Sequence, residues 1–149
     1  MGVDVYLKWD GMNEDEEKAQ FTGFAINAVG VGYLRESYGG RELATAVLIP
    51  EGWEGGSFQE GYMYRRGIDE IVLDGPASIL CAMWTDGSVS IPASVLVARL
   101  PETLAACGRR YEGEGHNLIE QVKNTFSQFV AMYAKLEKEG KRPRIYVSH

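Results

Sequence analysis

Hydrophobic and polar residues alternate strictly near the start of the chain, from residue 3 to residue 9. The apolar positions of this segment are Val3, Val5, Leu7 and Trp9. The positions between them are Asp4, Tyr6 and Lys8. Because successive side chains of a strand point to opposite faces, such alternation is typical of a strand with one buried face. The sequence therefore predicts a half-buried strand over residues 3–9.

A different period, of three and four residues, runs through the C-terminal part of the chain. Its apolar positions are Ile119, Val122, Phe126, Phe129, Tyr133 and Leu136. This spacing places all six side chains on one stripe of a helix, which we expect to pack on a sheet. Asn117, with Glu120 three residues later, predicts the start of this helix, and Gly140 predicts its end.

Capping residues and prolines predict three shorter helices. Asn13 stands three residues before Glu16, a capping pattern that predicts a helix over residues 13–21. Pro92 and Pro101 each suit the first turn of a helix, where the missing N–H is no loss. They predict two separate helical segments, over residues 92–99 and 101–110.

The remaining segments carry strand and turn signals. Residues 43–49 predict a strand that Pro50 ends, and residues 62–66 and 70–73 predict short strands around a turn at Gly67. Asp86-Gly87 between two apolar runs predicts a hairpin. A last strand is expected over residues 144–147, whereas residues 33–38 fit either one helical turn or a short strand.

Strands at both ends of the chain, with helices between them, predict an α+β fold. The simplest arrangement is a mixed or antiparallel sheet with the long C-terminal helix packed on one face. At 149 residues the chain is expected to form a single domain, residues 1–149. The chain is 45% hydrophobic and 24% charged, as in ordinary globular proteins, so bulk disorder is not expected.

The net charge of −6 is unevenly spread, because residues 1–75 hold 14 of the 21 acidic side chains and 6 of the 15 basic ones. An acidic surface repels phosphate backbones, so we expect no nucleic-acid partner. The N-terminus lacks a basic region followed by an apolar run, and no apolar run is long enough to cross a membrane. These features predict a cytoplasmic protein without a membrane partner, in which Cys81 and Cys107 are reduced.

The common catalytic and cofactor motifs are missing from the sequence. Two histidines, His116 and His149, and two cysteines without zinc-like spacing predict no metal site. No phosphate-binding glycine motif is present, so no cofactor is expected. Cys107 and His116 could form a nucleophile–base pair, but an alanine-rich helix around Cys107 favours a structural role.

Two glycine-flanked segments rich in tyrosine and arginine are the best candidates for a binding site. The first lies between Gly30 and Gly40 and contains Tyr33, Arg35, Glu36 and Tyr38. The second lies between Gly61 and Gly67 and contains Tyr62, Tyr64 and Arg66. Tyrosine and arginine are enriched where proteins bind partners, and arginine can hold a carboxylate or phosphate with two hydrogen bonds. Arg35 beside Glu36 is expected to keep that carboxylate ionised.

Several blocks resemble a group of small uncharacterised bacterial proteins. The blocks are Gly2-Val3-Asp4, Trp9-x-Gly11-Met12, residues 31–39 (Val-Gly-Tyr-Leu-Arg-Glu-Ser-Tyr-Gly), Ile91-Pro92-Ala93 and residues 98–101. They cover about a quarter of the chain, and residues 52–75 lie outside them. The group has no assigned activity, so the resemblance implies a bacterial cytosolic setting and transfers no catalytic residue.

These features favour a non-enzymatic module that binds a protein or a small anionic ligand. One form of this hypothesis is an inhibitor or immunity protein whose acidic face covers a basic partner. The alternative is a small enzyme acting on an anionic metabolite, with Arg35 and Arg66 as anchors and Glu36 or a tyrosine in proton transfer. A homodimer is compatible with either hypothesis.

Overall fold

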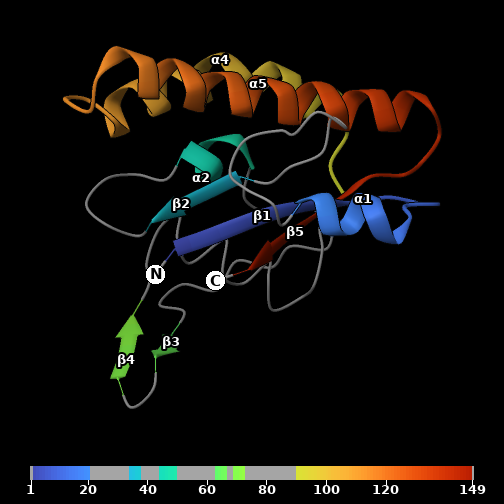
Figure 1. Ribbon diagram of the computed structural model, residues 1–149, viewed down its shortest axis with the longest axis horizontal. Coiled ribbons are helices and arrows are strands. Elements are labelled where there is room, and N and C mark those ends of the chain that lie inside the picture. The colour runs from blue at the N-terminus through green and yellow to red at the C-terminus, as the bar shows by residue number, and fades with distance from the viewer. Residues whose placement is uncertain are drawn as a thin grey trace.

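The computed structural model describes residues 2–20, 34–37, 44–49, 63–66, 69–72 and 90–148. Within them the chain forms an α+β fold, in which a three-stranded sheet carries a pair of long helices on one face (Figure 1). The strands of this sheet lie in the order β2-β1-β5. The predicted fold class is therefore confirmed, and the sheet is antiparallel.

The half-buried strand predicted at the start of the chain is confirmed as β1 (Gly2–Lys8), the central strand of the sheet. Val5, Leu7 and Trp9 are buried, whereas the side chains of Asp4, Tyr6 and Lys8 are only half-buried. β1 pairs with β2 (Leu34–Ser37) on one side and with β5 (Arg144–Ser148) on the other. Residues 34–37 thus form a strand and not a helical turn.

The short helix α1 (Glu14–Ala19) follows β1 and has the predicted capping box. The Asn13 side chain accepts a hydrogen bond from the Glu16 N–H at 2.8 Å, and the Glu16 carboxylate accepts one from the Asn13 N–H. Gln20, just after the helix, is buried and bonds to both backbone groups of Leu7. The Gln20 side chain thus supplies hydrogen-bond partners for the backbone of Leu7, which lies beyond the last residue pair between β1 and β2.

The long C-terminal helix, α5 (His116–Lys138), confirms the apolar stripe, since five of its six predicted positions are buried. The predicted cap at Asn117 is wrong, because Gly115 with φ 97° is the N-cap and Asn117 already lies within the helix. Gly140 ends the helix as predicted, with φ 74°. The Gly140 and Lys141 N–H groups bond to the carbonyls of Glu137 and Leu136, which is a Schellman motif.

The helix before it, α4 (Ala93–Arg110), is continuous, so the prediction of two separate helical segments is wrong. Pro101 lies inside it. A proline removes the hydrogen bond to the carbonyl four residues earlier, which here belongs to Val97. Val97 is 52% exposed and Pro101 is exposed too, so both lie on the outer side of the helix. We infer that water satisfies the Val97 carbonyl there, whereas the opposite, buried side of α4 holds the helix together.

Residues 43–49 were expected to form a strand, and this prediction is also wrong, because residues 44–48 form the helix α2 (Ala44–Leu48). The local sequence contains the β-branched residues Thr45, Val47 and Ile49, which favour strands. Tertiary contacts override that preference at both ends of α2. The Glu36 carboxylate accepts the Ala44 and Thr45 N–H groups, and the Arg99 guanidinium donates to the Val47 carbonyl.

The two short strands predicted around Gly67 are confirmed as β3 (Met63–Arg66) and β4 (Asp69–Val72). They pair antiparallel in a two-stranded sheet of their own, with Tyr64 opposite Ile71 and Arg66 opposite Asp69. The hairpin predicted at Asp86-Gly87 lies outside the described residues.

The core lies between the three-stranded sheet and the helices. As predicted, Val5, Trp9, Phe126, Phe129 and Tyr133 belong to one buried cluster. Tyr133 also organises the polar contacts beneath the start of α4. Its hydroxyl accepts from the Ile91 N–H at 3.0 Å and lies 2.7 Å from the Ile91 carbonyl oxygen, to which it donates.

Candidate functional site

The first candidate segment falls on strand β2, where Arg35 and Glu36 point to opposite faces of the sheet. Glu36 is 1% exposed and lies on the helix-covered face, whereas the Arg35 side chain is 64% exposed on the other face. Adjacent residues of a strand always separate in this way. The arginine next to Glu36 in sequence is therefore not the one that compensates its charge.

Arg110, near the end of α4, compensates Glu36. Its Nε lies 3.2 Å from Glu36 Oε1, and its side chain is only 5% exposed. Glu36 Oε2 accepts hydrogen bonds from the Thr45 N–H, at 2.7 Å, and from the Thr45 hydroxyl. The Ala44 N–H donates to Oε1 at 3.0 Å. One buried carboxylate thus ties β2, α2 and α4 together, which is a structural role.

Cys107 and Tyr111 lie close enough to this network to respond to it. Burial is the main cause that raises the pKa of the Cys107 thiol to about 12, and the Glu36 carboxylate adds to it. The same two causes raise the pKa of the Tyr111 phenol, and the Arg110 guanidinium opposes them. At neutral pH Cys107 is therefore a protonated, buried thiol, which is unsuited to act as a nucleophile.

We expect Cys107 in the native protein to resist alkylation by N-ethylmaleimide, because the thiolate is the reactive form and the side chain is inaccessible. Peptide mass spectrometry after labelling in native and in denaturing buffer separates Cys107 from Cys81. Cys81 lies outside the described residues, and its reduced state stays a prediction. The melting temperature should be the same with and without reductant. Rapid native labelling of Cys107, or a lower melting temperature in reductant, would contradict this assignment.

The face of the sheet opposite the helices presents a row of charged and aromatic side chains. We call it the polar sheet face and define it by Arg35, Asp4, Tyr6, Lys8 and Tyr146. The strand register pairs Asp4 with Arg35 and Tyr6 with Tyr146. Arg35 Nε lies 3.5 Å from Asp4 Oδ1, and the Lys8 ammonium lies 4.5 Å from the centre of the Tyr146 ring.

Asp4 is the unusual member of the polar sheet face. Among the described side chains, its Oδ1 is the buried polar atom that has no hydrogen-bond partner. Burial raises the pKa of the Asp4 carboxyl, and the Arg35 guanidinium opposes that rise. The ion pair with Arg35, at 3.5 Å, therefore compensates only part of the cost of burying this oxygen.

The other predicted site residues are placed only in part. Tyr33, Tyr38 and Tyr62 lie outside the described residues. Tyr64 and Arg66 lie in β3, where their spacing puts them on the same face of that strand. The predicted cleft between the two glycine-flanked segments therefore stays a prediction.

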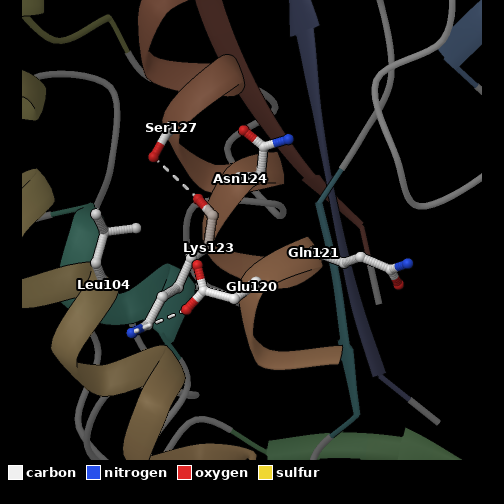
Figure 2. A pocket seen from close by; sticks show the side chains of 6 residues that line it. All are labelled: Leu104, Glu120, Gln121, Lys123, Asn124 and Ser127. Atoms are coloured by element: carbon white, nitrogen blue, oxygen red, sulfur yellow. Dashed lines mark hydrogen bonds and ion pairs between the residues drawn. The ribbon is translucent and has the colours of Figure 1, made fainter. Parts of the chain in front are cut away.

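A groove of about 520 Å³ lies between α4 and α5 (Figure 2). Its residues are Leu104, Glu120, Gln121, Lys123, Asn124 and Ser127. Lys123 pairs with Glu120 at 3.9 Å, and the Ser127 hydroxyl donates to the Lys123 carbonyl. Both contacts lie on α5, and the end of the Lys123 side chain lies beside Gly108 of α4.

Sequence reasoning missed Arg110 and Thr45, which complete the network around Glu36. It also missed Glu137, whose carboxylate accepts the Ala93 N–H at 2.8 Å and caps α4 from the neighbouring helix. Pro92 at the N-cap of α4 makes no side-chain cap. That absence is the one local signal that a distant group must satisfy this helix end.

Among the described residues, no three His, Cys, Asp or Glu side chains lie together as metal ligands would. No helix in the described part of the chain is both long and apolar enough to cross a bilayer. Comparison of the whole chain with models of protein families, with curated proteins and with solved structures finds no match.

Proposed function

We propose that this protein is a non-enzymatic binding module that recognises an anionic group of a protein or small ligand through the polar sheet face. The observation that carries the proposal is the position of Arg35. Its guanidinium is largely exposed, lies beside Asp4 and stands on the same face as Tyr6 and Tyr146. An exposed arginine with tyrosines nearby is a typical centre of a binding surface.

The chemistry of the polar sheet face suits a carboxylate or phosphate. Arg35 can hold an anionic oxygen pair with two parallel hydrogen bonds. The Asp4 side chain beside it is only 26% exposed and its Oδ1 is buried, so the Arg35 guanidinium is the group that a ligand would reach. The aromatic rings of Tyr6 and Tyr146 add contact area at little entropic cost.

The burial of Glu36 supports the binding hypothesis over the enzymatic one. A general acid or base must come within hydrogen-bond reach of its substrate. Glu36, the acid named for this role, is enclosed by Arg110, Thr45 and the start of α2. An enzyme built on these residues would have to open its core to use it.

A cytoplasmic, bacterial setting is part of the proposal. Cys107 is a free, buried thiol, and unpaired cysteines are typical of reducing compartments. The acidic net charge of −6 supports a protein or small-molecule partner and disfavours nucleic acid.

Arg35→Ala should abolish partner binding and change stability by less than about 1 kcal/mol, since exposed ion pairs contribute little. Two measurements test this: capture of proteins from bacterial lysate on the immobilised chain, and thermal shift with phosphate, citrate and nucleotides. Lys18→Ala is the matched control, because Lys18 is similarly exposed, pairs with Glu14 within α1 and is not one of the residues of the polar sheet face. A partner or anion retained equally by wild type, control and Arg35→Ala would overturn the proposal.

A further inference from the structure

The outer surface of the two long helices carries few exposed charges in its middle part. On α5 the exposed residues between positions 121 and 131 are Gln121, Asn124, Gln128 and Ala131. On α4 the exposed residues within about 100° of Leu104, which lines the groove, are Ser94, Val97, Pro101 and Ala105. Arg109 and Glu102 are exposed as well, but they lie roughly 140° and 160° around α4 from Leu104. We call the eight uncharged residues the helical face.

Other exposed helical surface of the same chain shows that this composition is not general. The exposed residues of α1 include Glu14, Asp15 and Lys18, and those at the end of α5 include Lys135, Glu137 and Lys138. Depletion of charged residues is the compositional mark of the centre of a protein interface. The helical face has that mark, with the mutually paired Glu120 and Lys123 along the groove and further charges at the end of α5.

The spacing on α5 fits a neighbouring helix. Exposed positions recur at Asn117, Gln121, Asn124, Gln128, Ala131 and Lys135, at intervals of four and three residues. This spacing forms a straight seam along the side of α5 that is turned away from the core. A second helix packed along such a seam would contact every one of its positions.

The chemistry of the seam favours a second copy of this chain as the occupant. A twofold interface places each residue against residues of the same patch, and a residue at the axis meets its own copy, so a charge there would be repelled. An amide side chain carries both donors and acceptors and can pair with another amide. Three amides at the centre of the seam are therefore self-complementary, in a chain whose net charge of −6 would otherwise oppose self-association.

The size of the helical face is sufficient for a weak dimer. α4 has 18 residues, so it is about 27 Å long, and two helices side by side are about 20 Å wide. The contact would bury about 1,000 Å² in total, which is the lower limit for a specific interface. The groove beside Asn124 gives side chains of the second copy a place to enter (Figure 2).

We propose that the helical face binds a second copy of this chain, with the two α5 helices antiparallel about a twofold axis beside Asn124. In this arrangement Gln121 of one copy lies opposite Gln128 of the other. The interface is distinct from the polar sheet face, because the sheet separates the two surfaces (Figure 1).

The test uses two double variants, one that introduces two negative charges and one that introduces two positive charges. Gln121→Glu/Gln128→Glu and Gln121→Lys/Gln128→Lys each place like charges against each other across the proposed axis. Both positions are exposed, so we expect the variants to fold like the wild type. Circular dichroism and thermal melting check this. Lys18→Glu in α1 lowers the net charge by the same amount as the glutamate variant and is the matched control. Sedimentation velocity from about 1 to about 500 µM covers the range expected for a small interface.

For the wild type and the Lys18→Glu control we expect the mass to rise with concentration from 16.5 kDa towards twice that value. Each double variant alone should dimerise at least tenfold more weakly, and an equimolar mixture of the two should regain dimers because opposite charges then meet. Wild type that stays at 16.5 kDa at every concentration would overturn the proposal and leave the helical face to a different partner. So would dimers that the double variants form as well as wild type, or a mixture that regains nothing.

Discussion

Glu36→Ala should destabilise the protein by about 3–5 kcal/mol, because it leaves a buried arginine without its counter-charge. The Arg110 side chain is 5% exposed and pairs with Glu36 at 3.2 Å. The substitution also removes the acceptor for the Ala44 and Thr45 N–H groups, so the start of α2 loses its cap. Urea denaturation followed by circular dichroism measures the free energy of unfolding.

Two further variants separate loss of the ion pair from general disruption. Adding Arg110→Met to Glu36→Ala should recover part of the loss, because the buried positive charge is removed while most of the side-chain volume is kept. Arg35→Ala, one residue away on the other face of the sheet, should cost less than about 1 kcal/mol. Equal losses for Glu36→Ala and Arg35→Ala would show that the network around Glu36 is not the main anchor of β2.

Phe126→Ala should destabilise the protein by about 3–5 kcal/mol, the range for removing a fully buried aromatic side chain. Phe126 is 0% exposed and lies on the stripe of α5 that faces the core. It belongs to the same buried cluster as Val5 of the central strand, so the cavity would open between the helix and the sheet. Thermal and urea unfolding both report this loss.

Leu118→Ala is the control for Phe126→Ala on the same helix. Leu118 is 37% exposed, so its truncation should change the free energy of unfolding by less than about 0.5 kcal/mol. A loss below about 1 kcal/mol for Phe126→Ala would mean that α5 is peripheral to the core, contrary to its burial.

The elements predicted correctly from sequence are those whose signal is local. The alternation of Val5, Leu7 and Trp9 and the stripe along α5 follow from side-chain periodicity, which acts within one strand or helix. The capping box at Asn13 and the end of α5 at Gly140 depend on hydrogen bonds between residues three to five positions apart. No distant partner is needed for any of them.

The wrong predictions concern segments whose hydrogen bonds are completed from far along the chain. α2 looks like a strand by composition, but Glu36 and Arg99 satisfy its two ends. α4 lacks a cap of its own, and Glu137 supplies it. Pro101 would end an isolated helix, yet the packing of the buried side of α4 keeps it continuous.

The candidate site shows the same difference between local signals and contacts with distant residues. The sequence alone determined that Arg35 and Glu36 stand together in a glycine-flanked, tyrosine-rich segment, and that β1 has one polar face. Only the tertiary structure decided that β2 is a strand paired with β1, so that Arg35 joins Asp4 on the polar sheet face while Glu36 enters the core. The physical reason is that a strand alternates its side chains, but which face is buried depends on what packs against it, here α2 and the end of α4.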